Sequence, residues 1–80
     1  MAIEEVPPTS PNVWYMIMQF DPRTAELIKF GDTYAASEYN LAEARRDAQE
    51  YAEQAATNNL PLQFMVVKVE VDKAYRPLGG

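Results

Sequence analysis

The sequence predicts a single α+β domain, with three antiparallel strands in one sheet and one helix packed on one face of that sheet. Two apolar stretches, residues 13–20 and 62–71, have the aromatic and β-branched composition of strands. Residues 41–57 between them are rich in alanine, glutamate, glutamine and arginine, which favour a helix. Residues 25–30 supply a further strand, so the order is β-β-α-β. We expect the first strand to lie between the other two (sheet order 2-1-3).

The first two strands are predicted to form a hairpin. The stretch VWYMIMQF is apolar at almost every position, which is typical of a strand buried on both faces. After it, Asp21 is placed to accept a bond from the backbone ahead of it, and Pro22 presets φ for a turn. Residues 25–30 then alternate as a strand does. Gly31 is expected to break this strand, and residues 32–39 are compatible with a continued strand or a loop.

The helix has recognisable ends and one apolar stripe. Asn40, with Glu43 three positions later, predicts its start. The stripe at helical spacing consists of Leu41, Ala44, Ala48, Tyr51, Ala52 and Ala55. Asn58 and Asn59 tolerate the backbone of a helix exit, and Pro61 prevents continuation. The acidic residues between these positions are interpreted as the solvated face of the helix.

The faces of the sheet are assigned from side-chain size. We expect the bulky set to face the helix, namely Trp14, Met16, Met18, Phe20, Ile28, Phe30, Met65, Val67, Val69 and Val71. The opposite face then carries Val13, Tyr15, Ile17, Gln19, Leu27, Lys29, Phe64, Val66, Lys68 and Glu70. Because one helix cannot cover both faces, this second set is predicted to form an exposed apolar surface, which soluble monomers seldom keep without a use.

The predicted partner-binding residues are therefore Tyr15, Ile17, Leu27, Lys29, Phe64, Val66 and Lys68. A second copy of the chain, a foreign protein, or the terminal segments of the same chain are the three candidates to cover this face. Self-association, through the uncovered face or through an edge strand, is the interpretation that we favour for the isolated chain.

The two ends of the chain are predicted to lie outside the domain. Residues 1–12 hold three of the six prolines and no periodic apolar pattern, so we expect a disordered or extended arm. The domain is predicted to span residues 13–75, and residues 76–80 to form a flexible tail.

The composition disfavours several classes of function. The sequence contains no histidine and no cysteine, which removes the usual general base and the commonest metal and redox ligands. We therefore predict a protein that is not an enzyme and needs no cofactor or metal. The net charge of −5 disfavours nucleic-acid binding. With neither a signal peptide nor an apolar span in the sequence, we expect no membrane partner and a cytoplasmic location.

Three short segments carry a resemblance to a known group of proteins. The strand and turn WYMIMQFDP, the helix start NLAEA and the closing FMVVKV, which runs on to YRP, are similar to small bacteriophage-encoded proteins of strand-strand-helix-strand layout. Phage inhibitors of bacterial RNA polymerase share this layout. The resemblance implies a non-catalytic inhibitor that occupies a surface of a host protein or defence complex, and it transfers no binding residue.

Two other classes of function stay open. The final Gly-Gly is how ubiquitin-like modifiers and sulfur carriers end, but that fold needs more strands than the residues after Asn59 can supply. A virion or assembly subunit, or a protein that sequesters a ligand, is the other alternative.

Overall fold

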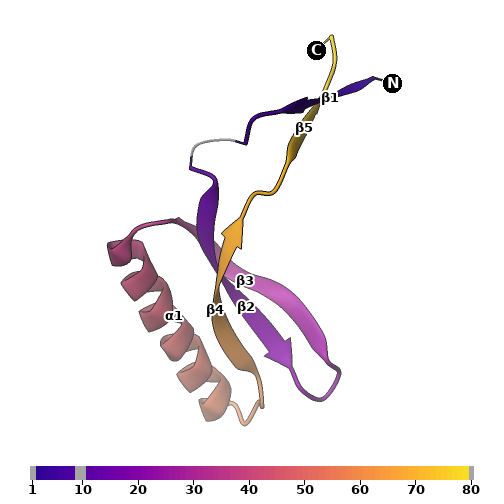
Figure 1. Ribbon diagram of the computed structural model, residues 1–80. Helices are drawn as coiled ribbons and strands as arrows, with labels where there is room; N and C mark the ends of the chain where they lie inside the picture. The colour runs from indigo at the N-terminus through magenta and orange to yellow at the C-terminus, as the bar shows by residue number, and fades with distance from the viewer. Residues whose placement is uncertain (1, 9–10, 80) are drawn as a thin grey trace.

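The computed structural model, which describes residues 2–8 and 11–79, confirms the predicted α+β class and strand order. A single helix lies on one face of an antiparallel sheet in which β2 is central (Figure 1). The elements of this body are β2 (Val13–Asp21), β3 (Glu26–Ala35), α1 (Glu38–Thr57) and β4 (Gln63–Glu70). Two further strands, β1 (Ile3–Val6) and β5 (Ala74–Pro77), pair with each other in a separate antiparallel ribbon.

The turn between β2 and β3 is built around Asp21, as predicted. Its carboxylate accepts a hydrogen bond from the backbone N–H of Arg23 at 2.9 Å, and its carbonyl accepts one from Ala25 at 2.8 Å. The Arg23 guanidinium bonds both carboxylate oxygens at 3.0 Å, which lowers the pKa of Asp21. The turn leaves four residues between the paired Asp21 and Glu26.

Strand β3 is longer than predicted because Gly31 does not end it. The register with β2 shifts between Met16 and Met18, so that extra residues of β3 form a bulge opposite Ile17. Gly31 sits in this bulge with φ of +80°, a conformation that suits glycine. The strand then continues to Ala35, which settles the assignment of residues 32–35.

The helix begins three residues earlier than predicted and ends where expected. Ser37, rather than Asn40, is the N-cap, and its hydroxyl accepts a hydrogen bond from the Asn40 backbone N–H at 3.0 Å. The Asn40 side chain instead donates to the carbonyl of Ala35. At the other end Asn59 has φ of +55°, and the Leu60 N–H bonds the Ala55 carbonyl at 2.9 Å, a Schellman-type exit.

The predicted orientation of the helix relative to the sheet is wrong. Ile17, which we expected on the uncovered face, has 0% exposure. Helix residue Tyr51 packs edge-on against Phe30 of β3, with ring centroids 4.8 Å apart, and against Phe64 of β4 at 5.8 Å. Because residues alternate along a strand, the helix covers the Tyr15 side of β2 and leaves the Trp14 side open.

The cause of the error is the register of the first hairpin. With four residues in the turn, Met18 pairs with Lys29 and Gln19 pairs with Ile28. Cross-strand partners share a face, so Ile28 lies on the side of Gln19 rather than on the side of Met18. The predicted grouping of β2 with β4 is consistent with the register, in which Met18 pairs with Met65. Relative to the helix, Ile28 and Leu27 therefore lie on the sides that we predicted, and it is the residues of β2 and β4 that were assigned to the wrong sides.

The core between helix and sheet is thin. Its buried hydrophobic members, in the part of the chain that the structure describes, are Ile17, Ala44, Ala48 and Ala55. The three alanines belong to the predicted helix stripe and let the helix lie close to the sheet. Only Ile17 is a large side chain that is fully buried.

The molecule is elongated because the β1–β5 ribbon projects from the body (Figure 1). Its extents are 52 × 31 × 17 Å and its radius of gyration is 16.4 Å, whereas a compact chain of this length has about 12 Å. The segments that we predicted as a separate arm and a flexible tail thus pair with one another. Among the described residues, β1 and β5 contact each other and no other strand or helix.

Candidate functional site

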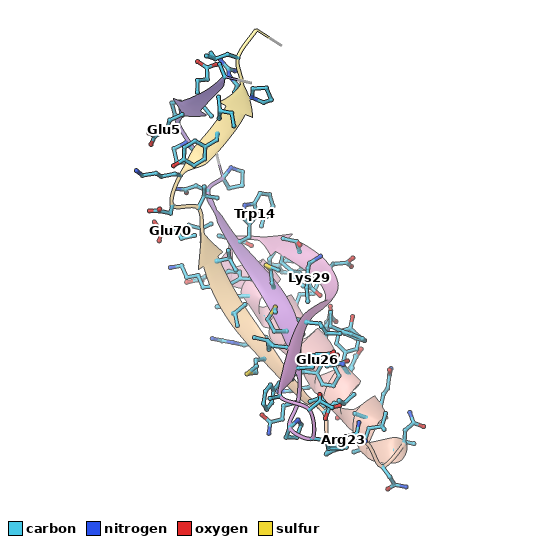
Figure 2. The ribbon with its side chains drawn as sticks, turned by 90° about the vertical axis from the view of Figure 1, so that its right-hand side faces the viewer. Glu5, Trp14, Arg23, Glu26, Lys29 and Glu70 are labelled. Atoms are coloured by element: carbon cyan, nitrogen blue, oxygen red, sulfur yellow. The ribbon has the colours of Figure 1, made fainter. Side chains whose placement is uncertain are left out.

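The side of the sheet away from α1 is a continuous apolar surface, which we call the open face. Figure 2 looks onto this side, with the helix behind the strands and Trp14 and Lys29 labelled. By the register of the strands, the open face consists of Trp14, Met16, Met18, Phe20, Leu27, Lys29, Thr33, Ala35, Gln63, Met65, Val67 and Val69. Leu27 is 53% exposed, and Met65 and Val69 are also exposed.

The open face carries no carboxylate, although the chain contains twelve acidic residues and has a net charge of −5. Its charged member is Lys29, on the edge strand β3. Acidic residues of the strands, such as Glu70, lie on the other side of the sheet or at its ends. An apolar surface without like charges is suited to contact with another apolar surface.

The structure divides the predicted partner-binding residues between the two faces. Leu27 and Lys29 lie on the open face, as expected. Tyr15, Ile17, Phe64 and Val66 lie on the side that the helix covers, so the surface predicted from them does not exist as a single exposed patch. Lys68 is exposed on the helix side of the edge strand β4.

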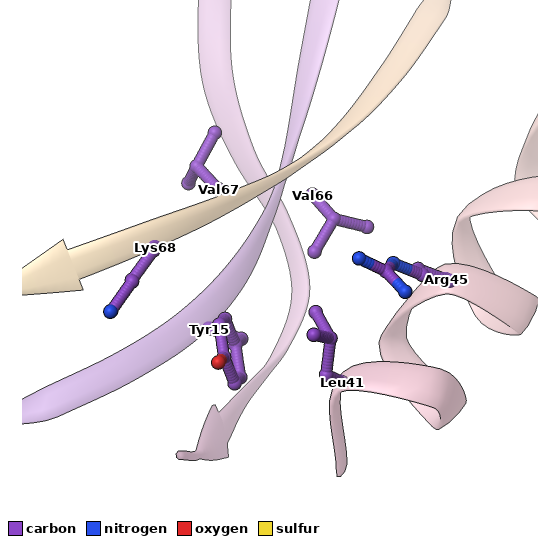
Figure 3. Close-up of a pocket in the computed structure, with 6 residues that line it drawn as sticks. All are labelled: Tyr15, Leu41, Arg45, Val66, Val67 and Lys68. Atoms are coloured by element: carbon purple, nitrogen blue, oxygen red, sulfur yellow. The ribbon is translucent and has the colours of Figure 1, made fainter. Parts of the chain in front are cut away.

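Three of these residues border a hollow of about 290 Å³ beside the first turns of the helix (Figure 3). Its lining is Tyr15, Leu41, Arg45, Val66, Val67 and Lys68. Leu41 and Val66 give it an apolar floor, and Arg45 and Lys68 supply two cationic groups. The hollow has room for a small group and the charge to attract an anion.

A partly buried hydrogen bond links β3 to the middle of the helix. The Tyr34 hydroxyl donates to the Asp47 carboxylate at 2.6 Å. Burial, followed by this bond to an anion, raises the pKa of Tyr34 well above its usual range. Asp47 was interpreted from the sequence as part of a solvated helix face, and the structure gives it this structural partner.

The terminal ribbon, formed by β1 and β5, is a second exposed surface that the sequence did not predict. Register pairs Ile3 with Pro77 and Glu5 with Tyr75, so these side chains share one face. Ile3 is 63% exposed and Tyr75 is 62% exposed. On the other face Arg76 bonds Glu4 at 2.6 Å. One side of the ribbon is therefore apolar with one carboxylate, and the other side is held by an ion pair.

The ribbon also includes the residues shortly before the C-terminal Gly-Gly that suggested a modifier. Pro77 belongs to β5, and the Leu78 backbone N–H donates to the carbonyl of Ala2 at 3.1 Å. Gly79 has φ of +68°, and Gly80 lies outside the described residues. A sulfur carrier or modifier presents this segment free, whereas here it is paired as far as Leu78.

Searches of the described residues for two other kinds of site give negative results. No three histidine, cysteine, aspartate or glutamate side chains gather where they could hold a metal ion. In the same part of the chain, no helix is both long enough and apolar enough to cross a membrane.

The length of the hairpin turn decides which side chains of β2 and β3 share a face. The four residues between Asp21 and Glu26 fix which residues pair, and pairing fixes which side chains share a face. Applied to Phe30, this rule places it beside Ile17 and leaves Met16 and Met18 on the opposite side. No comparable signal predicts the ribbon, because β1 and β5 are far apart in the sequence and too short to show a pattern.

Comparisons of the chain with protein-family models, with curated proteins and with solved structures find no match.

Proposed function

We propose that this chain is a non-catalytic binding protein, an inhibitor that works by occupying a surface of another protein, as the resemblance to phage-encoded inhibitors implies. The observation that carries the proposal is the terminal ribbon, which projects from the body with Ile3 and Tyr75 exposed. A two-stranded ribbon is only marginally stable in water on its own. A ribbon that contacts no other strand or helix among the described residues is therefore suited to insertion into a groove of a partner.

The chemistry of the ribbon defines the partner surface. Its apolar side presents Ile3, Pro77 and Tyr75, with the carboxylate of Glu5 among them. The complementary surface is an apolar groove with a lysine or arginine positioned to meet Glu5. The net charge of −5 also favours approach to a basic protein surface, because opposite charges accelerate encounter.

Affinity capture followed by reconstitution tests this function. The full-length chain is used to capture proteins from a bacterial lysate, and any protein that it retains is purified and tested against the double variant Ile3→Ser, Tyr75→Ser. We expect this protein to bind the unaltered chain directly, to bind the double variant at least tenfold more weakly, and to lose activity when bound.

The matched control is Tyr39→Ser, which removes an exposed tyrosine from the helix. The control variant should bind as the unaltered chain does. Equal binding by the ribbon variant would show that the ribbon is not the contact surface. Full activity of the partner in the complex would show that the chain is not an inhibitor.

A further inference from the structure

We infer that the open face is the interface of a homodimer, in which two copies stack sheet against sheet with β2 near the centre and the two helices outside. Three independent observations lead to a second copy of the chain as the occupant of this face. They are the thinness of the core, the exposed area, and the distribution of charge.

The first observation is that one copy buries too little. The core between α1 and the sheet holds Ile17 as its only large, fully buried side chain among the described residues. On the opposite side of β2 lie Trp14, Met16 and Met18, which are also bulky but remain partly accessible. Stacking two sheets about 10 Å apart gives these side chains a dry core between the sheets. A second copy is the partner that is present wherever the chain is made.

The second observation is the accessible area. The chain exposes 5948 Å², whereas a compact protein of its mass exposes about 4,900 Å². The excess of about 1,000 Å² is shared by the open face and the terminal ribbon. A standard interface removes about 800 Å² from each partner. A dimer interface on the open face would therefore remove part of this excess.

The third observation is charge. Two identical faces that meet around a twofold axis bring each charge close to its own copy. The open face carries no carboxylate in a chain of net charge −5, so two copies stack without acidic repulsion. Lys29, its charged member, lies on the edge strand β3, from which its side chain reaches solvent at the rim.

The oligomeric state and the fluorescence of the single tryptophan test the dimer directly. Light scattering should give twice the 9.1 kDa of one chain at micromolar concentration. Trp14 lies on the open face, so its emission should shift to longer wavelength on dilution, as the dimer dissociates. The monomer mass at every concentration up to about 100 μM, with no shift in emission, would overturn the inference and leave the face free for another protein.

A charged substitution locates the interface. Met18→Glu places a carboxylate at the centre of the face and should give a monomer, or a chain that unfolds more readily on dilution. Ala42→Glu, on the exposed side of the helix, is the matched control and should remain dimeric. A dimer that persists unchanged in Met18→Glu would show that the interface lies elsewhere.

Crosslinking keeps the test decisive if Met18→Glu fails to fold. Because the sequence has no cysteine, Met18→Cys and Ala42→Cys each introduce a single thiol. A bismaleimide that spans about 10 Å, the distance between stacked sheets, should link two copies through Cys at position 18 and not at position 42. The reverse pattern, or no linkage at position 18, contradicts the stacked arrangement. The ribbon variants Ile3→Ser and Tyr75→Ser leave this interface intact, so the dimer and the proposed inhibitor function succeed or fail separately.

Discussion

The two faces of the β3–β2–β4 sheet differ in a way that side-chain size alone would not suggest. The face with the larger apolar side chains on β2, Trp14 to Phe20, is the one that the helix leaves open. The covered face has Tyr15, Ile17 and Gln19 at the alternating positions. The turn and the pairing of the strands place Ile28 and Phe30 on the side of Ile17, and this is the side that the helix covers, although it is not the side with the bulkier residues of β2.

The covered face is completed by rings from the edge strands. The ring centroids of Phe30 on β3 and Phe64 on β4 lie 5.3 Å apart, and Tyr51 of the helix packs against both rings. The small alanines of the helix leave room for these rings. Edge-on aromatic pairs contribute about 0.5–1.5 kcal/mol beyond their buried area. The helix is thus held by a few aromatic contacts around Ile17 rather than by a broad apolar layer.

The largest effect is expected for Ile17 itself. Replacing Ile17, which has 0% exposure, by alanine should lower the free energy of unfolding by about 2–5 kcal/mol, because it opens a cavity under the helix. Ile28→Ala is the matched control, since Ile28 is 41% exposed, and it should cost less than about 1 kcal/mol. Urea unfolding measures both values, and equal losses would contradict the burial described for the covered face.

The next effect concerns the bulge that aligns β3 with β2. A Cβ atom at Gly31 would lie 3.2 Å from the Tyr51 hydroxyl, and φ at this position is +80°. Gly31→Ala should therefore lower the free energy of unfolding by about 1–3 kcal/mol. Gly79→Ala has a similar φ but no atom within 4 Å, and it lies outside the body. We expect almost no change in the free energy of unfolding for Gly79→Ala. Equal losses for Gly31→Ala and Gly79→Ala in urea unfolding would show that backbone strain, rather than contact with Tyr51, destabilises Gly31→Ala.

A smaller change of opposite sign is expected at the hairpin turn. Ala25 has φ of +60°, which costs a residue with a Cβ atom about 1–2 kcal/mol. Ala25→Gly removes this strain but adds freedom to the unfolded chain, so we expect a net gain of about 0.5 kcal/mol. In the exposed helix position Ala42 the same change should cost about 0.5–1 kcal/mol. Thermal unfolding compares the two, and a loss at position 25 would contradict the strained turn.

The smallest effect is a dependence on pH from the bond that ties β3 to the helix. The pKa of Tyr34 is raised from 10.0, so folding favours its protonated form. The stability that this group contributes is present below pH 10 and falls as the pH rises further, because only the unfolded chain then releases the proton. Tyr34→Phe should be less stable at pH 8 and lose less stability between pH 8 and pH 10.5. Urea unfolding at the two pH values measures this loss. An equal loss of unfolding free energy in the unaltered protein and in Tyr34→Phe would contradict the prediction.

The body and the ribbon also differ in how far the sequence predicted them. The class, the order 2-1-3 with a central first strand, and the end of the helix at Thr57 followed from apolar runs, alanine content and the Asn-Asn-Leu-Pro exit. These are local signals of 6 to 20 residues, and local structure obeys them. The helix start was misplaced because Ser37 and Asn40 are both good caps, and the Asn40 side chain found a partner at Ala35 instead.

What the sequence by itself determined is the set of elements of the sheet–helix body and the existence of one uncovered apolar face. Only the tertiary structure decided which face is uncovered. Only the tertiary structure also showed that the two ends of the chain pair with each other. The reason is physical: periodicity shows which side chains on one strand share a face, whereas the relation between strands depends on the register and the bulge at Gly31. The pairing of Ile3 with Pro77 depends on contacts between residues at opposite ends of the sequence, which no local pattern encodes.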